Sequence, residues 1–353
     1  MAVLFGGRSS EHAISCVSAG NVMAAIDRNL YNVIPIGITT DGKWLLQDDD
    51  AQLAIAGGTL PEITSGSPLQ VTSVPGAAIT GSELLSSIDV VFPLLHGPWG
   101  EDGTIQGFLE LAAIPYVGSG VYASAASMDK LHMKAAFRAA GLPVGPYAAV
   151  RPREWERARD AVLASLSQLP MPLYVKPARA GSSVGITKVK RSDDLVAAIE
   201  VARQHDPKVI VEAGIEGGRE IECAVLVDRD GTPRASVLGE IRVDAAHEFY
   251  DFAAKYLDDG AELIVPADLP PTVAERVQQL AVQAFEALDC EGLARVDFFV
   301  RNNGDVIINE VNTMPGFTPI SMYPRLWAAT GVDYPELIDT LIRDALRRGT
   351  GLR

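Results

Sequence analysis

The chain has 353 residues, of which 48% are hydrophobic and 21% charged, a composition typical of globular proteins and unlike disordered or collagen-like chains. At roughly 100–200 residues per domain, this length predicts two or three domains. Acidic residues (45) outnumber basic ones (30), and the net charge of −15 argues against a protein that coats nucleic acid, although a few local cations can still bind a small anion.

The first third of the chain alternates short apolar runs with helical patterns. Strands are expected at residues 2–5, 32–39, 89–94 and 115–118, helices at 15–27 and 103–112, and a small hairpin near 43–46. The N-terminal apolar run is too short for a signal peptide, and no run reaches the ~18 residues of a membrane span. Strands that alternate with helices predict a doubly wound parallel sheet, and we expect a cytoplasmic protein without a membrane segment.

The pattern changes to antiparallel after about residue 173. Helices are expected at 127–140, 152–169, 271–288 and 334–348, and strands at 173–177, 186–190, 220–227, 235–243 and in a hairpin over 293–312. The three cysteines, Cys16, Cys223 and Cys290, lie too far apart to suggest a zinc site and fit a reduced compartment. An α/β domain followed by mixed α+β units is therefore the predicted fold class.

The most informative stretch is the hairpin around Asn303-Gly304, a strong turn signal with alternating apolar residues on both sides. A two-residue turn there makes the numbers of facing residues sum to 607. Asp297 then faces Glu310, Arg295 faces Asn312, and all four side chains share one face of the sheet. Facing carboxylates repel unless a cation lies between them, so the pattern suggests Mg²⁺, although a solvated polar face or a three-residue turn stays open.

A second candidate is the loop from Lys176 to Gly185, which lies between two predicted strands. Its small residues would let backbone N–H groups approach phosphate oxygens, although the same composition suits a flexible hairpin tip. Lys130 and Lys176 stand next to the ends of predicted elements, where a point charge could meet a phosphate. The run Gly118–Ala123 matches a dinucleotide fingerprint, but no acidic residue follows at about +20, which argues against dinucleotide binding.

Several local sequences, in order and across nearly the whole chain, resemble those of the D-alanine–D-alanine ligases of the ATP-grasp superfamily. They are VLFGGRSSEHAIS, LHGPWGEDGTIQG, VGSGVYASAASMDK, VKPARAGSSVG, EFYDFAAKYL, ARVDFF and NEVNTMPGFTPISMYP. The resemblance implies ATP-dependent joining of two D-alanines through an acyl phosphate, two Mg²⁺ or Mn²⁺ ions per site, and a homodimer. It also implies an N-terminal unit (1–123) before a two-lobed ATP-grasp module (124–215 and 216–353) with a mobile loop over 244–262.

The resemblance further assigns roles to individual residues. For the nucleotide and metal these are Asp297, Glu310 and Asn312 as metal ligands, Lys130, Lys176 and Lys255 with Ser182 and Ser183 around the phosphates, and Glu212, Ile215 and Glu220 around adenosine. For D-alanine they are Glu11 and His96 at the first molecule, Ser321 and the N–H of Met322 at the second, Arg295 and the N–H of Gly316 as oxyanion donors, and Ser182 and Tyr256 closing the loop with Glu11.

Simpler interpretations remain for three of these residues. Glu11 could be an unligated charge at a helix N-terminus, His96 could end a strand, and Ser321 could only cap a helix. The chain also departs from the family at Ala180 and Ala213, where many members carry Glu and an adenine-contacting Lys, which puts one nucleotide contact in doubt.

Three other functions compete with a D-alanine dipeptide ligase. Another ATP-grasp carboxylate–amine ligase, such as a D-Ala–D-Ser or D-Ala–D-Lac ligase, is the nearest, and Tyr256 within FAAKYL favours the dipeptide enzyme. A non-catalytic nucleotide sensor would have no use for Arg295 as an oxyanion donor. A dinucleotide oxidoreductase is the weakest.

Overall fold

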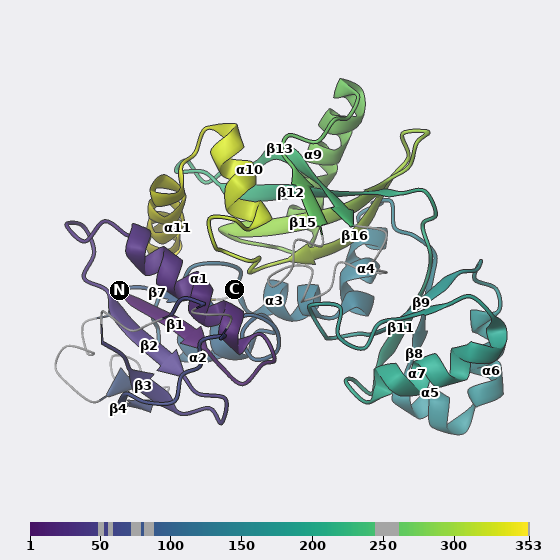
Figure 1. Ribbon diagram of the computed structural model, residues 1–353, viewed down its shortest axis with the longest axis horizontal. Coiled ribbons are helices and arrows are strands. Elements are labelled where there is room, and N and C mark those ends of the chain that lie inside the picture. Colours follow the sequence, from purple (N-terminus) through teal and green to yellow (C-terminus); the bar gives the residue numbers. More distant parts are fainter. Residues whose placement is uncertain (49–52, 56–58, 72–78, 81–87, 244–260, 352–353) are drawn as a thin grey trace.

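The computed structural model describes residues 1–48, 53–55, 59–71, 79–80, 88–243 and 261–351. In this part of the chain the strands form three main sheets and one two-stranded ribbon, β5–β6 (Gln70–Val71 and Ile79–Thr80). Figure 1 shows an N-terminal sheet at one end of the molecule, a middle sheet at the other, and a C-terminal sheet between them. A sheet with parallel central strands followed by antiparallel sheets confirms the predicted fold class, although the strands Trp44–Leu46 and Ser67–Pro68 pair antiparallel and make the first sheet mixed.

The N-terminal sheet has the strand order β4-β3-β2-β1-β7, and β1 lies parallel to both β2 and β7. Its strands are β1 (Ala2–Gly6), β2 (Ile34–Ile38), β3 (Trp44–Leu46), β4 (Ser67–Pro68) and β7 (Val91–Pro93). Alternate residues of β1 pack toward α1 (His12–Ala25) on one face and α2 (Thr104–Leu111) on the other, which explains its continuous apolar sequence. The strand expected at 115–118 is reduced to one bridge between Val91 and Tyr116.

Two helices predicted as continuous are each interrupted. The prediction over 127–140 is wrong because Asp129 has an extended backbone and its side chain accepts the N–H groups of Leu131 and His132, so it caps a new helix. The prediction over 152–169 is broken at Ala158, whose φ is −144°. The resulting helices are α3 (Val121–Met128), α4 (Lys130–Ala139), α5 (Pro152–Arg157) and α6 (Arg159–Leu166).

The middle sheet, of order β10-β9-β11-β8, is antiparallel and holds the glycine loop between β9 and β10. Its elements are β8 (Tyr147–Val150), β9 (Leu173–Pro177), β10 (Thr187–Val189), the 3-10 turn η2 (Ser192–Asp194), α7 (Leu195–Arg203) and β11 (Val209–Ala213). Trp155, Leu166 and Ile199 from α5, α6 and α7 pack on one face of this sheet and give it a core of its own.

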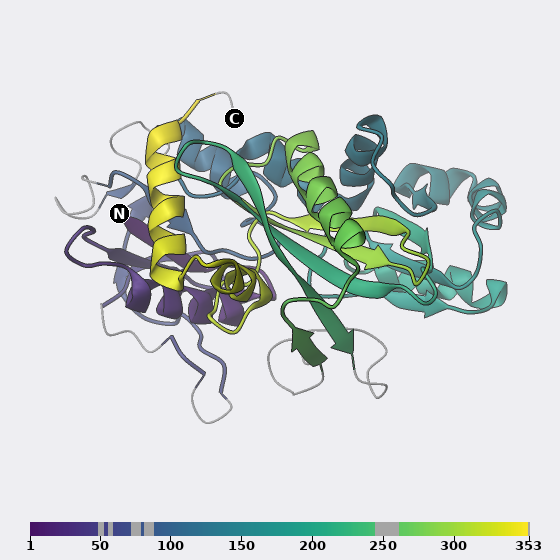
Figure 2. The same ribbon diagram turned by 90° about the horizontal axis from the view of Figure 1, so that it is seen from above.

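The C-terminal sheet has the order β14-β13-β12-β15-β16. Its strands are β12 (Arg219–Val227), β13 (Pro233–Val243), β14 (Ala261–Ile264), β15 (Leu293–Val300) and β16 (Val306–Asn312), and its helices α9 (Pro271–Ala287), α10 (Met322–Thr330) and α11 (Tyr334–Arg348). Figure 2 shows α9 over this sheet, and α10 and α11 on the side of the N-terminal sheet. The loop expected over 244–262 lies almost wholly outside the described residues.

An aromatic cluster joins the first sheet to the last helices. The ring of Phe317 lies 5.7 Å from that of Phe92 on β7 and 5.7 and 5.8 Å from those of Tyr323 and Tyr334. These side chains belong to one core that also contains Phe5 of β1. The N-terminal unit and the C-terminal helices, although far apart in sequence, therefore pack together around one core.

The three sheets fall within the three units predicted at 1–123, 124–215 and 216–353, and we propose to keep these bounds. By packing, however, Met133 and Phe137 of α4 belong to the core of the C-terminal sheet. In the described part of the chain, no helix combines the length and the apolar character needed to cross a membrane.

Candidate active site

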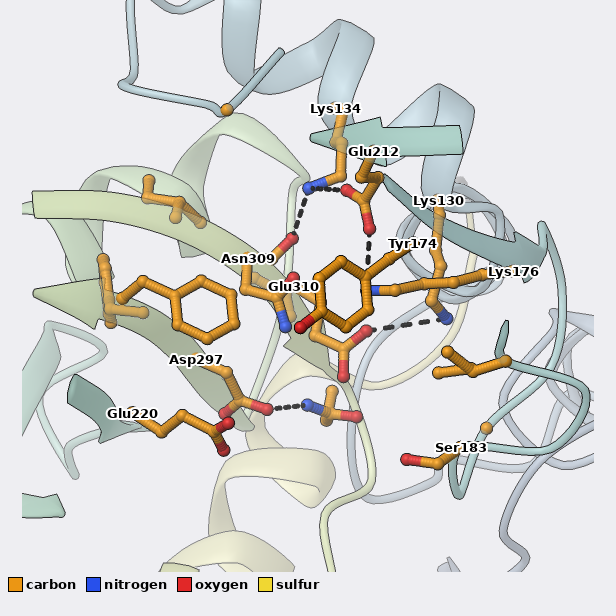
Figure 3. Close-up of a pocket in the computed structure, with 18 of the residues that line it drawn as sticks. Lys130, Lys134, Tyr174, Lys176, Ser183, Glu212, Glu220, Asp297, Asn309 and Glu310 are labelled. Atoms are coloured by element: carbon orange, nitrogen blue, oxygen red, sulfur yellow. Dashed lines mark hydrogen bonds and ion pairs between the residues drawn. The ribbon is translucent and has the colours of Figure 1, made fainter. Parts of the chain in front are cut away.

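A cavity of about 390 Å³ lies between the middle and C-terminal sheets. It is lined by the glycine loop, by α4, by the end of β11 and by β12, β15 and β16, and Figure 3 shows charged side chains from these elements meeting inside it. Eleven predicted site residues line it: Lys130, Lys176, Ser182, Ser183, Glu212, Ile215, Glu220, Arg295, Asp297, Glu310 and Asn312. Ala180 and Ala213, the two predicted departures from the family, line it as well.

The hairpin between β15 and β16 pairs Asp297 with Glu310 and Arg295 with Asn312, as predicted, but its turn differs from the predicted one. The turn has three residues, since Arg301 N–H donates to Asp305 O and Gly304 adopts a φ of +87°. The prediction of a two-residue turn is therefore wrong. A bulge at Asn309 restores the register, so Asp297 does face Glu310 and Arg295 does face Asn312.

The carboxylates of this hairpin are surrounded by cations. Arg295 donates two hydrogen bonds of 2.7 Å to Asp297 and lies 3.1 Å from Glu222 on β12. Lys130 Nζ lies 3.5 Å from Glu310, whose side chain is 27% exposed toward the cavity. The repulsion between Asp297 and Glu310 is thus offset by two basic side chains before any ligand is present.

The oxygen donors fit a divalent cation. Two carboxylates and an amide are hard ligands that suit Mg²⁺ or Mn²⁺, and the Asn312 side-chain nitrogen donates to Asp297 (3.0 Å), which leaves the amide oxygen for a cation. Over the described ranges, no group of three His, Cys, Asp or Glu side chains could hold a metal ion unaided. The ligand set predicted at this hairpin includes the amide of Asn312, which such a group of three does not count.

The end of the cavity that is predicted to bind adenosine is organised around Glu212 on β11. Its carboxylate lies 2.7 Å from Lys176 Nζ on β9 and 2.7 Å from Lys134 Nζ on α4 (Figure 3). Burial acts to raise the pKa of Glu212, but the two ammonium groups outweigh it and hold the pKa well below its usual range. Glu212 is therefore a fixed anionic acceptor, as contact with an exocyclic amine requires.

The glycine loop has the backbone of an anion-binding turn. Ser182 and Ser183, which are not glycines, adopt φ values of +49° and +58°, and Gly185 follows at +71°. Such left-handed residues are strained and point successive N–H groups into a concavity. Lys130 Nζ donates to Ala180 O (2.9 Å), so the loop is tied to the helix that carries this lysine.

Glu11 reaches this loop from the N-terminal unit. It occupies the N-cap position of α1, yet its side chain makes no cap hydrogen bond and instead accepts from Ser182 Oγ at 2.5 Å. A Cβ on Gly97 would lie 2.6 Å from Glu11 Oε2, so Gly97 leaves room for this carboxylate. The interpretation of Glu11 as only a helix-end charge is not supported by this geometry.

His96 is buried and both ring nitrogens are engaged. Nδ1 lies 3.1 Å from Met314 O, so it carries the proton, and Nε2 accepts from Ser18 Oγ at 3.2 Å. Burial lowers the pKa of His96, which keeps the ring neutral. The structure thus places His96 behind the 313–318 loop, and its direct contact with D-alanine stays a prediction.

Gly316, Ser321 and Met322, predicted as contacts of the oxyanion and the second D-alanine, are not among the residues that line this cavity. Ser321 is the N-cap residue of α10, but its hydroxyl makes no cap bond and lies 2.7 Å from Thr318 Oγ1. Met322 is buried against Gly239 of β13. Lys255 and Tyr256 lie outside the described residues.

Sequence reasoning missed Glu101, which lines the cavity. Its side chain lies between the N-terminal unit and the 313–318 loop. Its carboxylate accepts the N–H groups of Gly97 (2.7 Å) and Met314 (3.2 Å). Burial, together with the nearby charge of Glu11, raises the pKa of Glu101 from 4.5 to about 8. It lies within LHGPWGEDG, so the signal was a carboxylate in a motif already recognised.

We expect Glu101→Gln to change how stability depends on pH. The unfolded chain releases the Glu101 proton near pH 4.5, whereas the folded protein keeps it up to about pH 8, so the wild type loses stability across this window and the variant does not. Denaturant midpoints of both proteins at pH 5, 6.5, 8 and 9 measure the difference. It should grow in favour of the variant up to about pH 8 and then level off, and a constant difference would contradict the raised pKa.

Comparisons with known proteins agree with this geometry. Residues 1–119 match a family profile described as D-ala D-ala ligase N-terminus, and residues 136–343 match D-ala D-ala ligase C-terminus. The chain belongs to the D-alanine–D-alanine ligase family. The resemblance predicted from the sequence is therefore confirmed.

Similar proteins extend over the full chain. Ligases named D-alanine--D-alanine ligase are 55% identical in Kineococcus radiotolerans and 56% in Mycobacterium ulcerans, and the matches cover 100% of this chain and 98% and 97% of those proteins. The solved structure of the D-alanine-D-alanine ligase from Coxiella burnetii is 36% identical, with a TM-score of 0.79 and coverage of 98% and 95%. A D-Ala:D-Ser ligase from Enterococcus faecalis is 35% identical, with a TM-score of 0.82 and 98% coverage of both chains.

Proposed function

We propose that this protein joins two D-alanine molecules at the expense of ATP, giving D-alanyl-D-alanine for peptidoglycan synthesis. The observation that supports it most is the convergence in one cavity of a phosphate-binding loop, two lysines, facing carboxylates and Arg295, with Glu11 hydrogen-bonded to the same loop. A carboxylate cannot acylate an amine at neutral pH because its oxygen is a poor leaving group. Phosphorylation by ATP removes this obstacle, and each part of the cavity serves one stage of that chemistry.

The first stage is attack of a D-alanine carboxylate on the γ-phosphorus of ATP, which releases ADP. Lys130 and Lys176 offset the phosphate charge, and Glu212 with Ile215 and Glu220 holds the adenosine. Asp297, Glu310 and Asn312 would hold Mg²⁺ or Mn²⁺, two ions per site, which supply charge neutralisation at the phosphates. Glu11 binds the ammonium of this first D-alanine and orients its carboxylate.

The second stage is attack of the second D-alanine's amine on the acyl phosphate, which releases inorganic phosphate. Ser321 and the Met322 N–H bind the carboxylate of the incoming D-alanine. Arg295 and the Gly316 N–H stabilise the oxyanion of the tetrahedral intermediate. Ser182 and Tyr256, with Glu11, close the site against water, which would hydrolyse the acyl phosphate, and Lys255 contacts the γ-phosphate. A homodimer stays a prediction from the family resemblance, and a cytoplasmic location stays a prediction from the sequence.

A coupled ADP-release assay with D-alanine as the sole amino acid tests this function. We expect D-alanine alone to support full turnover, and D-serine or D-lactate added to it to give no faster release. The similarity to a D-Ala:D-Ser ligase makes the mixed product the second candidate. Release that requires D-serine or D-lactate would establish that candidate, and no release with any of the three would refute both.

A further inference from the structure

The side chain of Lys134, which no prediction included, connects two parts of the cavity. It lies one helical turn after Lys130 on α4, and its side chain is only 4% exposed. Its ammonium group lies 2.7 Å from Glu212 Oε1 and donates to Asn309 O at 2.9 Å, as Figure 3 shows. A buried ammonium group is costly unless it is paired in this way. One cation therefore contacts both the adenosine end and the metal-binding strand.

The contact with Asn309 falls on the bulge that sets the register of β15 and β16. With a three-residue turn and no bulge, Asp297 would face Asn309, and Glu310 would point to the other side of the sheet. The bulge is thus what places Glu310 opposite Asp297. Anything that holds the Asn309 backbone in place also holds the metal-binding pair.

Strand β16 is the edge strand of its sheet. Residues of neighbouring segments form hydrogen bonds with backbone groups along this stretch of it. Ile308 N–H donates to Pro143 O (2.8 Å), and Val311 N–H donates to Met133 Sδ (3.2 Å). Lys134 supplies the third of these contacts, at the bulged residue itself. Two successive side chains of α4, Met133 and Lys134, therefore contact the backbone at and near the bulge.

We propose that Lys134 is a positioning residue that fixes Glu212 as the nucleobase acceptor and, through Asn309, fixes the register of the metal-binding carboxylates. The inference rests on the proposed function, because ATP and a divalent cation are its ligands. Lys176 also pairs with Glu212, so the loss of Lys134 leaves Glu212 with a cation. Removing Lys134 should therefore change the positions of Glu212 and Asn309 more than the balance of charge around Glu212.

The test compares Lys134→Met with Glu212→Gln, which keeps the lysine for the contact with Asn309. Two affinities are measured directly: ATP in the presence of EDTA, by calorimetry, and Mn²⁺ in the presence of a non-hydrolysable ATP analogue, by the paramagnetic resonance of free Mn²⁺. We expect Glu212→Gln to weaken ATP binding alone. Lys134→Met should weaken both, with Mn²⁺ affinity reduced about tenfold, the scale of outer-shell partners of metal ligands.

Arg348→Met is the matched control. Arg348 is also a mostly buried cation, bonded to Asp344, Glu291 and Gly118 O, but it lies away from the cavity. Its loss should lower the denaturation midpoint without changing either affinity. This separates the proposed role of Lys134 from a general loss of stability.

Two results would overturn the proposal: Mn²⁺ affinity in Lys134→Met within twofold of the wild type, or the same pattern in Lys134→Met as in Glu212→Gln. If Lys134→Met does not fold, Lys134→Arg replaces it, because its longer side chain must displace Asn309 or Glu212. A smaller loss of Mn²⁺ affinity is then expected, and an unchanged value overturns the proposal. A wild type that binds neither ATP nor Mn²⁺ would instead refute the proposed function.

Discussion

Glu310→Gln is expected to abolish nearly all ADP release while leaving the protein folded. The amide keeps the shape of the side chain but loses the charge that faces Asp297 across the hairpin. We expect a loss of ~100-fold or more, since even outer partners of metal ligands cost up to about that much. Stability should change little, because the substitution removes one of two mutually repelling carboxylates and the ion pair of Glu310 with Lys130 is as long as 3.5 Å.

The measurement is ADP release at saturating Mg²⁺ together with a denaturation curve. Glu275→Gln, at an exposed position on α9, serves as the control and should match the wild type in both. If Glu310→Gln turns over within threefold of the wild type, the metal assignment is wrong.

Arg295→Met should cost about 10²–10³ in rate, the usual scale for one lost oxyanion donor. It should also cost stability, because Asp297 and Glu222 would be left without the guanidinium that lies 2.7 and 3.1 Å from them. Removing one member of a buried ion pair typically costs about 3–5 kcal/mol.

Arg295→Lys separates these two effects. A lysine keeps the charge between the carboxylates but not the planar set of donors, so it should restore stability more than rate. Initial rates and urea midpoints of both variants check this. An unchanged rate in folded Arg295→Met would remove Arg295 from the mechanism.

The pairing of Asp297 with Glu310 shows how much of the site could be predicted from the sequence. Asn303-Gly304 and the alternation of apolar residues located the hairpin and its polar face, but the register came out right only because two errors cancelled. The turn is one residue longer than predicted, and the bulge at Asn309 adds one residue to β16. Nothing local marks that bulge, since contacts with α4, distant in sequence, stabilise it.

The helix break at Asp129 was missed for a related reason. The run Ser127–Ala140 has helical character throughout, and Asp129 is recognisable as a cap only once its side chain is seen to accept two N–H groups. Lys134 and Glu101 were missed because ordinary lysines and glutamates are mostly exposed, and burial is not visible in composition. The family resemblance, by contrast, rested on long motifs, and eleven of the residues to which it assigned roles line the cavity.

The aromatic packing of Phe92 against Phe317 has a consequence for chimeric proteins. A chain cut near residue 120 would separate β7 from the rings that cover it and leave an apolar surface on both pieces. The middle sheet keeps its own core under α5, α6 and α7. Exchange of segments between relatives should therefore succeed for the middle sheet with its helices, whereas the two ends of the polypeptide must be taken from the same parent.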